Sequence, residues 1–258
     1  MKAYLSIIFV LFFSISFGQG ILEPGVRLRD EGKYEESISY YLNEKKEGYW
    51  DWGHKYNYAK VLALAGQVDS CFFYLEENIN KRIAVQSLRD KEFIGIKEDK
   101  RWTTYEQSVI NKHIPCKDVT FSAEIFRILA LSDKESTNIK LLFELINKKG
   151  WPKQSQVGDA ASYIFATLIY EDLFLVQAKK HLKELKELCI KGEIDCEYFA
   201  DTYDLVQKKA NKPQKYGAIF NIDYDNDFKR IYYKFVDEKK INKWRTEIGL
   251  KKLEEFSD

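Results

Sequence analysis

The chain of 258 residues is poor in histidine and cysteine, with three of the first and four of the second. It has no CxxC pair, so the ligand spacing of a structural zinc site is missing. The sequence also lacks the GxSxG, HExxH and GxxxxGK[ST] patterns of serine hydrolases, metalloproteases and phosphate-binding loops. We therefore expect neither a metal nor a cofactor, and the sequence identifies no catalytic residue.

An excess of one charge is also missing. The chain has 41 basic and 40 acidic residues, and the two signs are mixed along its length, which is typical of solvated helix faces. Proteins that bind nucleic acid or anionic membranes normally show a basic excess. The composition therefore argues against nucleic acid as a partner.

Long apolar runs are absent after the N-terminus. Lys2 precedes the apolar residues 4–13, and Ser16 and Gly18 give the small-x-small ending of a secretory signal peptide. The alternative is an uncleaved membrane anchor, but the run falls short of the roughly 20 residues that span a bilayer. We expect removal of residues 1–18, with cleavage between Gly18 and Gln19, and no transmembrane segment in the mature chain. The protein would then be periplasmic or extracellular.

Export permits disulfide bonds, and Cys71, Cys116, Cys189 and Cys196 allow three pairings. Cys189 and Cys196 flank a short loop, which favours this pair and leaves Cys71 with Cys116. The alternative is four free thiols that are buried like small apolar side chains.

Residues 19–115 resemble tetratricopeptide repeats. Residues 32–37 recur as residues 66–71, an offset of 34 residues, which is the period of that helix-turn-helix repeat. In each copy a glycine (Gly32, Gly66) lies in the turn between two helices. A small residue (Ser37, Cys71) lies where the helices approach closely. Stacked repeats of this kind form concave surfaces that bind peptides.

Pro115 predicts the boundary of a second, helical domain over residues 116–258. Apolar periodicity predicts helices at 125–129, 141–146, 160–168, 173–188 and 195–206. We expect Ser155 to cap the third of these and Asp195 the last. Residues 219–224 and 231–235 read as two strands of a β-hairpin. The predicted fold class is therefore mainly α, a short helical-hairpin array followed by a helical bundle with a C-terminal β-hairpin.

Two motifs mark the second domain: Gly150-Trp151-Pro152, and Pro213-Gln214-Lys215-Tyr216-Gly217. Together they resemble an uncharacterised bacterial domain family of unassigned function, over roughly residues 134–256. Other positions that match the family are Gln177, Gly192, Asp204, Arg245, Gly249 and Leu250. The chain departs from the family at Ile169-Tyr170, where Gln-His is typical. It also has Leu205 in place of an arginine. The resemblance therefore supports the fold better than it supports an activity.

The motif residues form a candidate ligand site. An aromatic wall with a few convergent polar groups is the usual make-up of a small-molecule pocket. The candidate residues are Trp151, Tyr170, Asp204, Gln214, Tyr216 and Arg245. We expect the two motifs to meet at one end of the helical bundle, with Arg245 as the counter-charge of Asp204. The structural alternative is a helix stop with a buried indole at Trp151 and a helix-to-strand corner at Tyr216.

Acidic residues offer weaker candidates. Asp201 and Asp204 share a helix face and could act as an acid–base pair only if burial raised one pKa. Asp223, Asp225 and Asp227 lack the glycine and glutamate of a calcium loop, so we interpret them as a hairpin turn.

Two functions remain open. One is a binding or scaffolding protein of the bacterial cell envelope, with a protein or peptide partner on its helical repeats. The other is a periplasmic hydrolase that uses the region of Trp151, Asp204, Gln214 and Tyr216.

Overall fold

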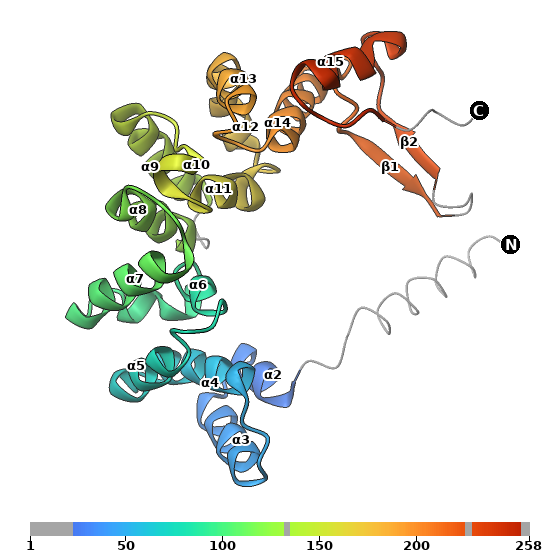
Figure 1. Ribbon diagram of the computed structural model, residues 1–258. Helices are drawn as coiled ribbons and strands as arrows, with labels where there is room; N and C mark the ends of the chain where they lie inside the picture. The colour runs from blue at the N-terminus through green and yellow to red at the C-terminus, as the bar shows by residue number, and fades with distance from the viewer. Residues whose placement is uncertain (1–22, 132–134, 225–228, 254–258) are drawn as a thin grey trace, which may run out of the picture. The chain divides into compact units, whose positions relative to one another are not determined.

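The computed structural model describes residues 23–131, 135–224 and 229–253, which are mainly α-helical with one two-stranded antiparallel sheet near the C-terminus (Figure 1). The predicted fold class is confirmed. Within the described ranges, no helix is long and apolar enough to cross a membrane. The predicted leader, residues 1–18, lies outside those ranges.

The chain divides into two compact units. Unit 1 comprises the residues up to Ser87 together with residues 92–103, and unit 2 comprises residues 88–91 and 104–258. The division falls inside helix α7 (Lys100–His113), upstream of the boundary that Pro115 suggested.

Unit 1 is built from helical hairpins in which each helix packs on the next. Its elements are α2 (Pro24–Asp30), α3 (Tyr34–Lys46), α4 (Trp52–Leu64), α5 (Val68–Glu77), α6 (Ala84–Ser87) and the 3-10 helix η1 (Lys91–Ile96). Gly32 and Gly66 precede α3 and α5 with φ of +76° and +73°. Glycine adopts this left-handed conformation without steric cost. The two turns are therefore alike, at the offset seen in the sequence.

Small residues let the first pair of helices approach closely. The hydroxyl of Ser37 on α3 donates to the carbonyl oxygen of Gly25 on α2 at 2.7 Å. A Cβ atom at Gly25 would lie 2.6 Å from the ring of Tyr41. Cys71 on α5, the counterpart of Ser37, is fully buried. The sequence pattern of small residues therefore reflects close packing between helices.

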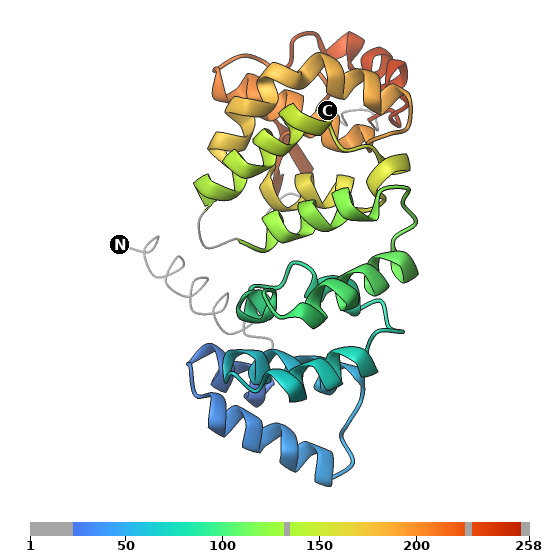
Figure 2. The same ribbon diagram turned by 90° about the vertical axis from the view of Figure 1, so that its left-hand side faces the viewer.

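Unit 2 is built mainly from short helices that pack against one another (Figure 2). These are α8 (Val119–Ala130), α9 (Glu135–Lys149), α10 (Gln154–Val157), α11 (Ala160–Leu168), α12 (Asp172–Ala178), η3 (Lys179–His181), α13 (Leu182–Ile190) and α14 (Cys196–Lys209). Asp195 caps α14 through the backbone N–H of Glu197, as predicted.

Two helix predictions for unit 2 need correction. The predicted helix 173–188 is interrupted by η3 at residues 179–181, where the His181 ring lies 5.5 Å from the Trp151 ring. Ser155 does not cap the helix carrying residues 160–168. It lies inside α10, where its hydroxyl is held by Glu193 at 2.8 Å, and α11 begins only after Gly158.

The C-terminal part of unit 2 is a β-hairpin followed by a short helix. Strands β1 (Phe220–Asp223) and β2 (Lys229–Tyr232) pair antiparallel, with Phe220 opposite Tyr232. The predicted hairpin is thus confirmed, although Asp225 and Asp227 of its turn lie outside the described residues. The 3-10 helix η4 (Glu238–Lys240) and α15 (Ile241–Glu247) follow the hairpin, and α15 lies beside it (Figure 1).

Candidate functional site

The corner between α14 and β1 is organised around the buried carboxylate of Asp204. This side chain has no exposed surface. It accepts hydrogen bonds from the backbone N–H groups of Lys215, Tyr216 and Ala218 at 2.7 to 3.2 Å. Burial raises the pKa of Asp204, while the three amides and the positive charge of Arg245 act in the opposite direction. Asp204 therefore serves as the anchor of the corner.

Gln214 ties the same corner to the residues that flank the two strands of the hairpin. Its side-chain amide donates to the carbonyl oxygens of Ile219 and Tyr233, and its Oε1 accepts from the N–H of Ile219. Its backbone forms an isolated parallel bridge with Phe235. All these partners are backbone groups, so the fully buried side chain of Gln214 is used in folding.

Tyr216 fills the space beneath the corner. Its ring packs edge-on against Phe199 and Tyr203 of α14, with ring centroids 5.6 and 5.3 Å away. The following Gly217 has φ of +71°, and a Cβ atom there would lie 2.5 Å from the Leu253 side chain. The Tyr-Gly pair is therefore required by a tight, left-handed turn against the C-terminal segment.

Arg245 from α15 closes the corner from the other side. Its guanidinium donates to the carbonyl oxygens of Tyr216 and Lys251 and pairs with Glu197 at 3.3 Å. We expected a direct pair with Asp204. That expectation is wrong, because the backbone amides already occupy the carboxylate.

Trp151 lies in a different cluster from the corner. The rings that contact it belong to Phe143, Phe165 and His181, at 5.5 to 6.0 Å between centroids. The side chain is 1% exposed, and its indole N–H finds no acceptor within the described ranges. The expected meeting of Trp151 with the corner residues is therefore not observed, and Trp151 acts as an apolar core residue.

Tyr170 completes the set of sequence candidates, and it points to solvent. It is 77% exposed, at the connection between α11 and α12. The structure thus brings together Asp204, Gln214, Tyr216 and Arg245 as the framework of a corner, and it leaves Trp151 and Tyr170 elsewhere. These contacts support the structural alternative, in which Gly-Trp-Pro is a helix stop with a buried indole and Pro-Gln-x-Tyr-Gly is a helix-to-strand corner.

Asp201 is the acid of α14 with the most unusual environment. It makes no hydrogen bond to another described residue, and burial together with the charges of Glu197, Asp204 and Asp195 raises its pKa to about 6; Arg245 opposes this shift. The sequence indicated Asp201 and Asp204 as a possible acid–base pair. The carboxylate of Asp204 is instead hydrogen-bonded to the backbone N–H groups of the corner. Within the described ranges, no group of histidine, cysteine and acidic side chains could hold a metal ion.

Cys189 and Cys196 are joined by a disulfide bond, with a Cα separation of 4.9 Å. The favoured pairing is confirmed for these two residues. The loop that they close carries Glu193, whose carboxylate accepts from the backbone N–H and the hydroxyl of Ser155. The disulfide loop therefore holds the segment that follows the Gly-Trp-Pro motif.

The suggested bond between Cys71 and Cys116 is not formed, since both thiols are free. Cys71 is enclosed within unit 1, while Cys116 belongs to unit 2. Burial raises the pKa of Cys71 to about 12. An enclosed, protonated thiol has no access to a second cysteine.

An exposed aromatic patch on unit 1 was not identified from the sequence. We define the aromatic patch as the exposed Phe73 and the half-buried Trp50 around the buried ring of Tyr74, with Lys45 and with the exposed Tyr49 that precedes Trp50 in the chain. Trp50 and Phe73 both pack edge-on against Tyr74, and the Lys45 ammonium lies over the Trp50 and Tyr74 rings at 5.4 and 5.8 Å. Tyr49 and Phe73 keep 64% and 57% of their surface exposed. The only signal in the sequence was the aromatic run at residues 49–52.

The comparisons with known proteins add no assignment to these sites. Neither a family model, nor a curated protein, nor a solved structure matches the chain.

Proposed function

We propose that the protein is an exported binding protein of the bacterial cell envelope that holds a protein or peptide partner on the helical hairpins of unit 1. The observation that supports the proposal is the aromatic patch. Tyr49 and Phe73 are its exposed aromatic side chains, and contiguous exposed apolar surface often marks a site where a protein meets a partner.

The make-up of the patch indicates the chemistry of that partner. Tyrosine and tryptophan are enriched at the energetic centres of protein interfaces, because they offer large rigid surfaces and a polar tip. Lys45 donates a hydrogen bond to the hydroxyl of Tyr74 at 3.3 Å, which holds its charge against the rings of the patch. A partner segment with an apolar side chain next to a carboxylate would match both features.

The alternative of a periplasmic hydrolase draws no support from the motif residues. Asp204 and Gln214 are fully buried and bonded to backbone groups, and Trp151 lies in another cluster. None of the three is placed to contact a substrate, so we do not extend the proposal to catalysis.

Photo-crosslinking in cells that export the protein tests the proposal, with a crosslinker at Tyr49 and mass spectrometry of the products. We expect a defined partner whose yield falls at least tenfold in Phe73→Ser. Because Phe73 is exposed, this variant should fold normally. The matched control is Tyr170→Ser, an exposed aromatic of unit 2, which should keep the full yield. A partner recovered equally with both variants, or no partner at all, would contradict the proposal.

A further inference from the structure

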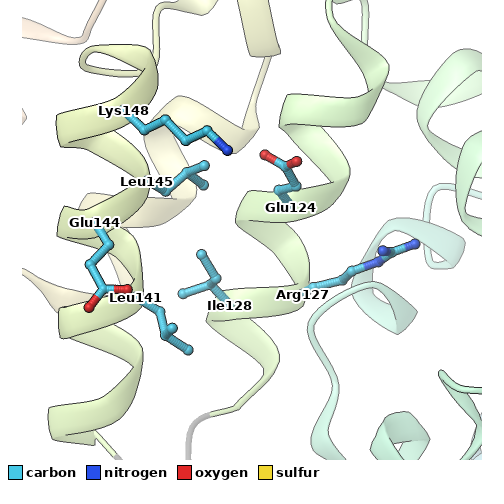
Figure 3. Close-up of a pocket in the computed structure, with 7 residues that line it drawn as sticks. All are labelled: Glu124, Arg127, Ile128, Leu141, Glu144, Leu145 and Lys148. Atoms are coloured by element: carbon cyan, nitrogen blue, oxygen red, sulfur yellow. The ribbon is translucent and has the colours of Figure 1, made fainter.

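An open groove of about 340 Å³ lies between α8 and α9 of unit 2 (Figure 3). Ile128 from α8 and Leu141 and Leu145 from α9 provide its apolar side chains. Leu141 keeps 37% of its surface exposed, and Ile128 and Leu145 are half-buried. The two helices thus present a shallow apolar surface that nothing in the described chain covers completely.

Two of the charges around the groove are already neutralised within unit 2. Glu124 accepts from Lys149 at 2.6 Å. Arg127 binds the buried carboxylate of Glu106 through two nitrogens, at 3.1 and 2.5 Å. These pairs hold the α8 side of the groove in place and leave it without an unpaired charge.

The α9 side carries an acid and a base that are free. Glu144 and Lys148 line the groove, and neither forms an ion pair or a hydrogen bond with another described residue. They are one helical turn apart on α9, next to Leu145 (Figure 3). Such a groove is complementary to an apolar surface that places a positive charge opposite Glu144 and a negative charge opposite Lys148.

We propose that this groove binds the same groove of a second copy of the chain. A two-fold axis that crosses α9 between Glu144 and Lys148 makes the two α9 helices antiparallel. In an interface with this symmetry both copies use the same surface, so each contact occurs twice. Glu144 of each copy then faces Lys148 of the other. Leu145 of both copies meet near the axis, and Leu141 and Ile128 of each copy pack to either side of it, so that two helical hairpins form a four-helix arrangement.

Self-complementarity is the reason for choosing a second copy over another protein. Both charges find their partners in the two-fold arrangement, and the apolar side chains of each copy cover those of the other. The apolar surface is small, and interfaces of small area give weak association. We therefore expect the dimer to be populated only toward the upper end of the micromolar to millimolar concentration range.

Sedimentation of the purified chain from micromolar to millimolar concentration tests the proposal, with charge reversals that exploit the two-fold axis. In Glu144→Lys and in Lys148→Glu, residues 144 and 148 carry the same charge, so both charge pairs across the axis become repulsive. Each variant should therefore dimerise at least tenfold more weakly. An equimolar mixture of the two variants restores both attractive pairs, and so does the double variant Glu144→Lys/Lys148→Glu. We expect both to associate like the wild type.

The control reversals are Lys183→Glu and Glu187→Lys on α13, which have the same spacing on an exposed helix face of unit 2 and should leave association unchanged. A wild type that stays monomeric at millimolar concentration overturns the proposal. A dimer that the α9 reversals do not weaken, or that the mixture does not restore, overturns it as well.

Discussion

At the scale of single residues, Asp204 shows how one carboxylate organises a corner. Its two oxygens accept from the backbone N–H groups of Lys215, Tyr216 and Ala218 at 2.7 to 3.2 Å. Backbone N–H groups that are buried without an acceptor cost free energy, so the loop conformation and the carboxylate depend on each other.

Asp204→Ala should therefore lower the free energy of unfolding by about 3–5 kcal/mol, because it leaves several buried donors unsatisfied. Tyr216→Phe is the matched control in the same corner. The Tyr216 hydroxyl makes no hydrogen bond to another described residue, so we expect a loss of about 1 kcal/mol or less. Urea denaturation measures both values. Equal losses would show that the carboxylate does not anchor the corner.

Asp201 gives unit 2 a predictable pH dependence. Its pKa is about 6 in the folded protein and about 3.9 in an unfolded chain. Below about pH 3 both states are protonated, and the residue contributes nothing. As the pH rises from about 4 to 6, the unfolded state releases its proton first, so the free energy of unfolding falls. Above pH 6 the folded state bears the full cost of the buried charge.

Asp201→Asn should remove that cost. At pH 8 we expect the variant to be more stable than the wild type by about 1–3 kcal/mol. At pH 3 the two proteins should be equally stable, because Asp201 is then protonated in both the folded and the unfolded wild type. Urea midpoints at the two pH values decide the matter, and a difference of the same size at both would rule out titration of Asp201 as the cause.

At the scale of elements, the pattern of apolar residues predicted most of the helices and the hairpin, because these depend on local periodicity. It did not predict the η3 turn at residues 179–181 or the position of Ser155 inside α10. Both are set by tertiary partners, namely the rings around His181 and the carboxylate of Glu193. Periodicity carries no information about such long-range contacts.

The candidate site was predicted less well than the fold, for a physical reason. Conspicuous motifs such as Gly-Trp-Pro and Pro-Gln-x-Tyr-Gly are equally compatible with a ligand pocket and with a tight corner. The difference lies in the hydrogen-bond partners of Asp204 and Gln214, which are backbone groups of residues up to 19 positions away. The surfaces that remain exposed, such as the α8–α9 groove, have no motif at all.

The disulfide loop is the element whose contribution can be isolated most simply. Cys189 and Cys196 join the end of α13 to the start of α14. Cross-linking stabilises mainly by restricting the unfolded chain, and for a short loop this contributes about 2–3 kcal/mol. We expect the Cys189→Ser/Cys196→Ser variant to lose that amount in urea denaturation.

The matching control is the wild type after reduction, which should lose a similar amount. The loop carries Glu193, whose carboxylate accepts a hydrogen bond from the backbone N–H of Ser155 at 3.0 Å. We therefore also expect faster amide hydrogen exchange at Ser155 in the variant. Unchanged exchange at Ser155 would mean that the loop keeps its conformation without the bond.

At the scale of the whole molecule, the two proposed binding surfaces belong to different units. The aromatic patch lies in unit 1, and the α8–α9 groove lies in unit 2. Changes at Phe73 should therefore leave self-association intact, and changes at Glu144 should leave partner capture intact. The two proposals can fail independently, which makes each experiment a control for the other.

The state of the four cysteines links the structure to the expected export. A disulfide persists in oxidising compartments such as the bacterial periplasm. We therefore expect the mature protein to begin at Gln19 and to contain one disulfide and two thiols. Iodoacetamide should modify Cys116 in the folded protein, because that residue is partly exposed, and spare Cys71, whose thiol is buried with a pKa of about 12. Thiolates, not thiols, react with such reagents.

Intact-mass analysis of exported protein, before and after alkylation, measures all three features at once. Unfolding in urea should expose Cys71 and add a second label, whereas Cys189 and Cys196 should be labelled only after reduction. Cys116→Ser is the control, since it should show no label while folded. A mature chain that still begins at Met1 would contradict the predicted cleavage. Four labelled cysteines without reduction would mean that the Cys189–Cys196 bond does not form in the cell.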